Sequence, residues 1–312
     1  MYLPYLRGKQ FELLALKSFS QNNPNCSSII PIIEPVKINT KALEIAFNVM
    51  MENQLRFTVI LNPREGDFKH PINNDILSFV PSLNEKLDNW MPAYIYNKNG
   101  NRIIGHSNHY ELNDLMIIFN QSIDFNDPDI NKLLLNTKVR YVIINNSSRA
   151  TKSKLRNIGK NIISLEDRFK VRQKNADYLN PDDEFYSDDF AFFQEENLWG
   201  YSDYTTIGKD FIEGGMLPYA IAIHLTYQKS DNEINVHHFV SDNNYDQSNI
   251  KGKFLEAARK IAPFYEEKGL AHTKAVNELI EKSLSYDSYP GLGYLKKLSI
   301  LNHLELIKRL TD

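Results

Sequence analysis

The sequence has almost no cysteine and no long apolar run. Cys26 is the one cysteine in 312 residues, which excludes an internal disulfide framework. A chain without disulfides fits a reducing compartment, so we expect a cytoplasmic protein. No stretch approaches the ~18 consecutive apolar residues of a membrane-spanning helix. The first residues also lack the apolar segment of a secretion signal, and we therefore expect no association with a membrane.

The sequence also lacks a large excess of charge of one sign and the common cofactor-binding motifs. The 36 basic and 39 acidic residues give a net charge of −3. Without a global basic field, we expect contact with nucleic acid only through a partner. Neither a Gly-x-Gly-x-x-Gly nor a P-loop motif follows an apolar run, which disfavours Rossmann and P-loop folds. No His-x-His, His-Glu-x-x-His or Cys-x-x-Cys occurs, so a zinc site is not indicated.

What the sequence does contain is a regular alternation of short apolar runs with helical patterns. The runs predict eight strands, at 28–36, 56–62, 93–97, 115–121, 139–145, 161–165, 201–207 and 220–227. Helical spacing lies between most of them, including a segment from Pro71 to Trp90 that Pro81 interrupts. Strand–helix alternation is typical of parallel βαβ units, and eight units favour a closed (β/α)8 barrel.

Helical patterns also lie at both ends of the predicted barrel. One covers 10–19, before the first predicted strand, and several follow residue 251. We therefore expect residues 1–250 to form an α/β barrel with an N-terminal helix. Residues 251–312 are expected to form C-terminal helices packed on the barrel, so that the chain is one structural unit.

The run from Ala220 to Tyr227 has the alternation expected of a barrel strand. Ile221, Ile223 and Leu225 form a bulky face, while small and polar residues form the other. A bulky outer face meets helices and a small inner face meets other strands. His224 then points inward near the carboxyl end, where barrel enzymes place their active sites. The alternative is a buried histidine that is hydrogen-bonded to a neighbour.

Polar residues that follow the predicted strands form the candidate site. Because the carboxyl ends of barrel strands converge, we expect these side chains to meet. The candidates for catalysis are Glu34, Asp203 and His224; those for ligand binding are Asn62, Arg64, Asn145, Glu166, Arg168, Tyr204 and His238. Two carboxylates and a histidine suit acid–base chemistry, and arginines suit a phosphate or carboxylate.

Two other interpretations of these residues stay open. Glu34, Asp203 and His224 form an oxygen- and nitrogen-rich set that would suit a divalent metal. Glu34 with Arg64 or Arg168 would equally form a structural ion pair inside the barrel mouth. His237 and His238 are neighbours on opposite faces of a strand, so the two cannot easily share one ion.

The segment 175–198 interrupts the alternation of predicted strands and helices before the seventh predicted strand. Residues 175–184 are acidic and turn-prone, and residues 188–196 are acidic and aromatic. A long insertion at the loop face of a barrel often covers a site or binds a partner. The simpler interpretation, which we favour, is a decorated connection.

Several motifs together resemble the beta-protein family of bacteria and phages. They are Tyr2–Gln10, Pro31–Val36, Gly200–Gly208, Ala220–Tyr227, His238–Asp242 and Pro290–Tyr294. The branch that this chain resembles is often encoded beside a protein similar to a restriction nuclease. The resemblance implies a two-protein defence system against phages or mobile DNA. It supplies no catalytic residues, so the candidate site rests on the strand ends alone.

Two functional hypotheses follow from these observations. In the first, the chain is a barrel-shaped subunit that binds a nuclease-like partner or senses a small phosphorylated or phage-derived ligand. In the second, it is a hydrolase or phosphodiesterase that acts on a nucleotide-like or phosphorylated substrate through Glu34, Asp203 and His224. The second argues from the fold by analogy, because barrels of this kind are usually enzymes.

Overall fold

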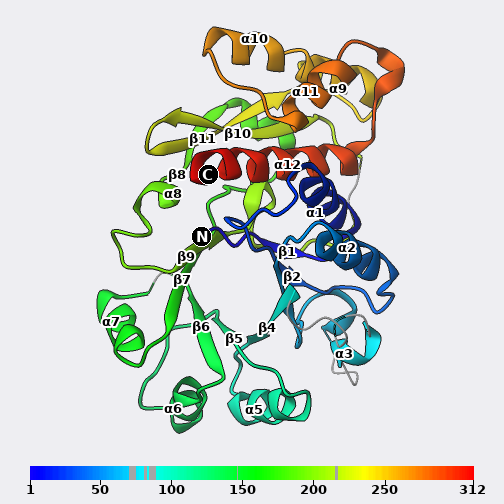
Figure 1. The fold of residues 1–312 in the computed structure, drawn as a ribbon. Helices are drawn as coiled ribbons and strands as arrows, with labels where there is room; N and C mark the ends of the chain where they lie inside the picture. Colours follow the sequence, from blue (N-terminus) through cyan, green and yellow to red (C-terminus); the bar gives the residue numbers. More distant parts are fainter. Residues whose placement is uncertain (70–74, 81–82, 84–88, 146, 215–216) are drawn as a thin grey trace. The chain divides into compact units, whose positions relative to one another are not determined.

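The computed structural model describes the chain except for residues 70–74, 81–82, 84–88, 146 and 215–216. It contains an eight-stranded parallel sheet that forms a nearly closed barrel, with helices between the strands (Figure 1). The predicted (β/α)8 fold is therefore confirmed. In sheet order the strands are β1 (Tyr5–Arg7), β2 (Ile32–Glu34), β3 (Phe57–Ile60), β4 (Trp90–Ile95), β5 (Leu115–Phe119), β6 (Val139–Ile144), β7 (Asn161–Glu166) and β9 (Gly200–Asp203).

The two ends of the sheet are joined beside β1. Tyr2 forms a parallel bridge with Tyr201 of β9. The Leu3 N–H donates to the Tyr201 carbonyl at 2.9 Å, and the Tyr201 N–H donates to the Met1 carbonyl at 3.0 Å. Gly200 is needed at this seam, because a Cβ there would lie 2.7 Å from the Met1 carbonyl oxygen. Closure satisfies backbone groups that an open sheet would leave at its edges.

Most barrel strands are apolar on both faces because one face meets helices and the other meets the barrel interior. All five residues of β5, Leu-Met-Ile-Ile-Phe, are buried. Continuous apolar runs of this kind are typical of parallel strands. They are the signal that located β2 to β7 in the sequence.

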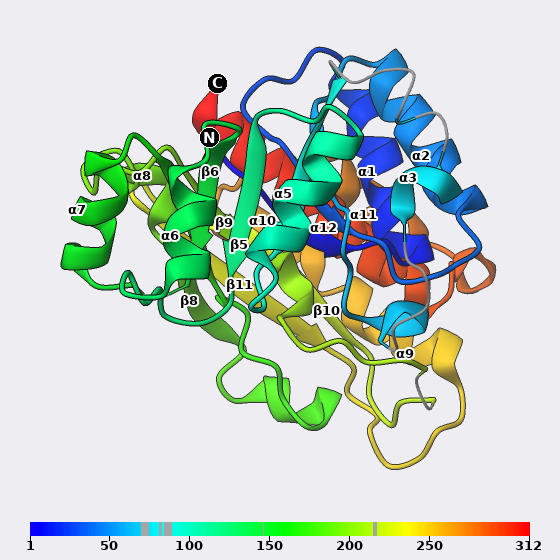
Figure 2. The same ribbon diagram turned by 90° about the horizontal axis from the view of Figure 1, so that it is seen from below.

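The prediction that residues 220–227 form the eighth barrel strand is wrong. The run belongs to β10 (Ala222–Ser230), which pairs antiparallel with β11 (Glu233–Val240). β11 in turn pairs antiparallel with β8 (Asp183–Ser187), and β11 lies between the other two (Figure 2). The two-residue turn between β10 and β11 is the reason, since a parallel crossover needs a dozen residues or more. The barrel strand that the sequence analysis missed is β1.

Helices lie between the barrel strands, as the alternation of the sequence predicts. Between barrel strands lie α2 (Lys41–Glu52), α3 (Ile76–Phe79), α5 (Gly100–His109), α6 (Pro128–Leu135) and α7 (Arg149–Asn157). The Asp127 side chain caps α6 by accepting from the Asp129 N–H, and Pro128 occupies the first turn. Pro71 and Pro81, which bear on the helix expected over 71–90, lie outside the described residues.

The chain divides into two compact units, each made of several separate segments. Unit 1 comprises Met1–Lys9, Asn23–Glu166 and Phe192–Asp203, and it contains all eight barrel strands. Unit 2 comprises Gln10–Asn22, Asp167–Ala191 and Tyr204–Asp312. None of the helices in the described part of the chain is long and apolar enough to span a membrane.

Unit 2 combines the antiparallel sheet with helices. These are α1 (Gln10–Asn22), α8 (Asp189–Phe192), α9 (Ile250–Ala258), α10 (Ile261–Glu267), α11 (Lys274–Lys282) and α12 (Leu292–Thr311). The helix predicted at 10–19 is α1, which follows β1 in the chain rather than preceding the barrel. Gly293 in the first turn of α12 lies against Phe11 of α1, where a Cβ would collide with the ring.

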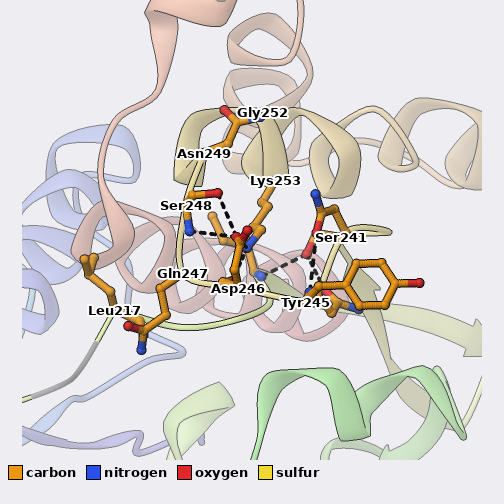
Figure 3. A network of polar contacts seen from close by, with 12 residues as sticks. Leu217, Ser241, Tyr245, Asp246, Gln247, Ser248, Asn249, Gly252 and Lys253 are labelled. Carbon is orange, nitrogen blue, oxygen red and sulfur yellow. Dashed lines mark hydrogen bonds and ion pairs between the residues drawn. The ribbon is translucent and has the colours of Figure 1, made fainter.

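Lys253, a buried lysine of α9, donates a hydrogen bond to the loop that precedes this helix (Figure 3). Lys253 is 1% exposed, and its Nζ donates to the Asp246 carbonyl. The Asp246 carboxylate accepts from the backbone N–H of Ser248 at 2.8 Å and also lies 3.4 Å from Lys253 Nζ. The Asn249 side chain caps α9 by accepting from the Gly252 N–H. The loop is therefore tied to the first turns of α9.

Candidate functional site

The pairing of β1, β2 and β3 shows which side chains face the barrel interior. Ile32 pairs with Thr58 in parallel register, so the two side chains share a face. The neighbouring residue Phe57 points the other way and stacks on Phe47 of α2, with ring centroids 4.8 Å apart. The face of Phe57 is therefore the helix-covered exterior. Ile32, Thr58 and Glu34 consequently belong to the interior.

Glu34 lies at the carboxyl end of β2 in a cluster with two residues of β1. Arg7 pairs with Glu34 in register, and Tyr5 lies two residues before Arg7 on the same face. The Tyr5 hydroxyl donates to Glu34 Oε2 at 2.6 Å, and the Arg64 backbone N–H donates to Oε1 at 2.8 Å. The Arg7 guanidinium lies 5.6 Å from the centroid of the Tyr5 ring. We call Tyr5, Arg7 and Glu34 the mouth cluster.

The mouth cluster is almost fully removed from solvent. Glu34 is 2% exposed, Tyr5 5% and Arg7 9%. Burial raises the pKa of Glu34, while the hydrogen bonds from Tyr5 and Arg64 and the charge of Arg7 act in the opposite direction. Among the described strand residues on the interior face, Arg7 and Glu34 are the only charged ones. These two charged interior side chains therefore both lie at the carboxyl ends of their strands.

Asp203 occupies the same edge of the barrel as Glu34 but the opposite face. It shares a face with Tyr201, which bridges Tyr2, and the Tyr2 hydroxyl donates to Asp203 Oδ1 at 2.7 Å. Tyr2, which precedes β1, therefore lies on the face of Tyr201, whereas Tyr5 of β1 lies on the interior face with Glu34. Glu166 pairs with Asp203 and shares its face. The structure therefore does not bring Glu34 and Asp203 together, and a joint catalytic role stays a prediction.

The remaining candidates in unit 1 follow β3 and β6 and differ in exposure. Asn62 bonds both backbone groups of Ile95, its Oδ1 accepting and its Nδ2 donating at 2.8 Å, which ties the end of β3 to β4. Arg64 contributes its backbone to Glu34 and keeps an exposed side chain. Asn145 follows β6 and is exposed. Of these, Arg64 is the one best placed to meet a ligand beside Glu34.

The other four candidates belong to unit 2. Arg168 forms a bidentate ion pair with Asp189, at 2.9 Å from Nε and 2.6 Å from Nη2. Tyr204 is buried. His224 and His238 pair across β10 and β11, and their Nδ1 atoms lie 2.8 Å apart. The sequence analysis named both histidines but not their contact, because it assigned His224 to the barrel.

No group of three or more His, Cys, Asp or Glu side chains in the described part of the chain is arranged to hold a metal ion. Glu34 and Asp203 lie on opposite faces of one sheet, and His224 lies on another sheet. The observed donor sets therefore give no support to the metal site considered from the sequence.

The sequence analysis missed Tyr5 and Arg7 as members of the site. Their strand has three residues and follows Pro4, too short a run to show a period of two. The available signal was the alternation of Tyr5 and Arg7 on one face, with a charged residue in an otherwise apolar stretch. Comparison with models of protein families and with curated proteins gave no match to this chain.

Proposed function

We propose that the barrel of unit 1 binds a small phosphorylated ligand at its mouth cluster. In this proposal the chain is the ligand-sensing subunit of a two-protein bacterial defence system and acts in the cytoplasm with a nuclease-like partner. The defence setting comes from the family resemblance described above. The binding role rests on the geometry of Tyr5, Arg7 and Glu34.

The binding role is supported by the hydrogen bonds that fix the orientation of the Glu34 carboxylate. Each carboxylate oxygen already accepts a hydrogen bond, one from Tyr5 and one from the Arg64 backbone. The charge of Arg7 acts on the same carboxylate. An oriented carboxylate beside an arginine fixes the direction of that guanidinium, which is the group best suited to a phosphate or carboxylate. The exposed Arg64 adds a second cation at the rim.

The test of this proposal is to express the chain together with the nuclease-like protein encoded beside it and to measure protection against phages. Arg7→Gln removes the cation of the mouth cluster and is expected to abolish protection. Arg140→Gln is the matched control, because Arg140 is an exposed arginine of the same barrel. Mass spectrometry of small molecules retained by the purified chain should give a phosphorylated species that Arg7→Gln lacks. Full protection by a stably folded Arg7→Gln variant would refute the sensing role.

One observation favours the alternative of a hydrolase or phosphodiesterase. Burial raises the pKa of Glu34, as is common for carboxyl groups that transfer protons in active sites. The purified chain is therefore incubated with a chromogenic phosphodiester. Cleavage that disappears in Glu34→Gln but persists in Glu52→Gln would favour the enzyme over the sensor, since Glu52 is an exposed residue at the end of α2.

A further inference from the structure

Unit 2 contains a buried polar cluster that is separate from the mouth cluster. His224 of β10 pairs with His238 of β11, and Glu184 of β8 pairs with Val236, two residues from His238. The three polar side chains therefore share one face of the antiparallel sheet. His238 and Glu184 have side chains that are 1% and 6% exposed, while His224 is only part-buried. We call His224, His238 and Glu184 the histidine cluster.

Glu184 forms ion pairs with two cationic side chains. Arg172 Nη2 lies 2.6 Å from its Oε1, and Lys170 Nζ lies 3.0 Å from its Oε2. Burial alone would raise the pKa of Glu184, but the hydrogen bonds from Arg172 and Lys170 lower it overall. Glu184 is thus anionic at neutral pH. Its Oε1 also lies 3.4 Å from His238 Nε2, so the anion faces the histidine pair.

This geometry selects one arrangement of protons on the two imidazoles. The Nδ1 atoms are 2.8 Å apart, so one of them must carry the hydrogen that the other accepts. If His238 Nδ1 carried it, the bare Nε2 of a neutral His238 would face the carboxylate of Glu184, which is repulsive. If His224 Nδ1 carries it, His238 Nε2 carries a hydrogen 3.4 Å from the oxygen of the anion, which is attractive. The second arrangement leaves His224 Nε2 with a lone pair.

The surroundings keep both histidines neutral and define what His224 can meet. Burial is the main cause that lowers the pKa of His224, followed by the charges of His238 and Lys296; burial also lowers the pKa of His238, to about 4. The ring of Tyr178 lies 4.5 Å from that of His224, and the ring of Phe169 lies 5.0 Å from it. Lys296 is exposed on α12. Two aromatic rings beside a proton acceptor, on which the charge of Lys296 also acts, suit a small anionic ligand that carries a hydroxyl group.

We propose that the histidine cluster is a proton relay in which Glu184 fixes His238, His238 fixes His224, and His224 accepts the proton of a hydroxyl on a small anionic ligand. In that step the O–H bond of the ligand breaks and its electron pair stays on the oxygen. The proton forms a new N–H bond at His224 Nε2. The imidazolium keeps its hydrogen bond to His238 Nδ1, and the Glu184 carboxylate stabilises the added charge through His238. His238 and Glu184 are positioning residues in this scheme.

The direct test is the tautomer of each histidine in the intact chain at pH 7. Long-range ¹H–¹⁵N correlation spectra are expected to show His224 protonated at Nδ1 and bare at Nε2, and His238 the reverse. A His224 protonated at Nε2, or a positively charged His224 at pH 7, would overturn the relay. His237→Gln is the matched control, because His237 lies on the same strand but on the opposite face.

Two further measurements separate a relay from a purely structural cluster. Glu184→Gln is expected to slow modification of His224 by diethyl pyrocarbonate about tenfold, because it removes the negative charge 3.4 Å from His238 Nε2. The rate at the exposed His272 is the internal reference. Inorganic phosphate is expected to shift the His224 resonances, and Lys296→Gln should remove that shift. Equal modification rates, or no response to phosphate, would contradict the proposal whatever the outcome at the barrel mouth.

Discussion

The side chains of Glu34 and Asp203 leave the barrel sheet on opposite faces, although both residues end strands at the same edge. Glu34 shares the interior with Tyr5, which donates to it at 2.6 Å. Asp203 shares the exterior with Tyr2, which donates to it at 2.7 Å. Two tyrosines three residues apart, Tyr2 before β1 and Tyr5 within it, thus each bind one of the two carboxylates. The interior member of this arrangement is the one that a ligand entering the barrel would meet.

Tyr5→Phe should destabilise the protein by about 1–3 kcal/mol, because it removes the hydroxyl that satisfies a buried carboxylate oxygen. The free energy of unfolding from urea titrations is the measurement. Tyr245→Phe is the control, since Tyr245 is 90% exposed, and it should change stability by less than about 0.5 kcal/mol. Equal stability of the two variants would mean that Tyr5 and Glu34 do not interact in solution.

The histidine pair should make the protein less stable as the pH falls. Burial is the main reason that the pKa of His224 is lowered and that the pKa of His238 falls to about 4. The unfolded chain, with histidine pKa values of about 6.5, then binds more protons than the folded chain. Stability is therefore fully present above about pH 6.5 and declines as the pH drops toward 4.

Thermal melting of the wild type and His238→Gln between pH 7.5 and 5 measures this dependence. The contributions of other titrating groups to stability cancel when the two proteins are compared. The variant should lose less stability on acidification than the wild type does. His272→Gln, at an exposed position, should follow the wild type. Parallel pH profiles for all three proteins would argue against a buried neutral pair.

Gly66→Ala should be strongly destabilising, by about 2 kcal/mol or more. Gly66 has a φ of +61°, and a Cβ there would lie 2.1 Å from the Val36 carbonyl oxygen. Gly105 offers the opposite case within the same unit, because it is exposed in α5 and a Cβ would meet nothing within 4 Å. Gly105→Ala should stabilise by about 0.5–1 kcal/mol. The difference in urea midpoint between the two variants tests the backbone geometry at the end of β3.

Lys253→Met should loosen the loop shown in Figure 3. The substitution keeps much of the buried aliphatic volume but leaves the Asp246 carbonyl without its lysine donor. We expect faster cleavage within residues 242–249 by a broad-specificity protease and a loss of about 1–3 kcal/mol in stability. Lys251→Met removes an exposed lysine two positions earlier and should leave the cleavage rate unchanged. An unaltered rate in Lys253→Met would show that other contacts hold the loop.

The barrel could be predicted from the sequence because most of its strands have a local pattern of apolar residues. The run Leu115–Phe119, for example, is apolar on both faces, as is typical of parallel strands that are buried on both sides. Counting such runs gave the right fold but one wrong strand. The run at 220–227 has a face of small and polar residues, which also suits a hairpin, and the polar turn after it decided for the hairpin. Tyr5–Arg7 was too short to count.

Local patterns of apolar and turn residues were enough to predict the class of fold and the positions of most strand ends, since such patterns act over a few neighbours. Which of those strand ends share a face depends on contacts between segments that are distant in the chain. Side chains alternate between the two faces of a strand, and the pairing register with the next strand decides which of them face the barrel interior. That register is set by backbone hydrogen bonds between distant segments. The bridge between Tyr2 and Tyr201 therefore places Asp203 outside the barrel, and the pairing of Arg7 with Glu34 places that carboxylate inside.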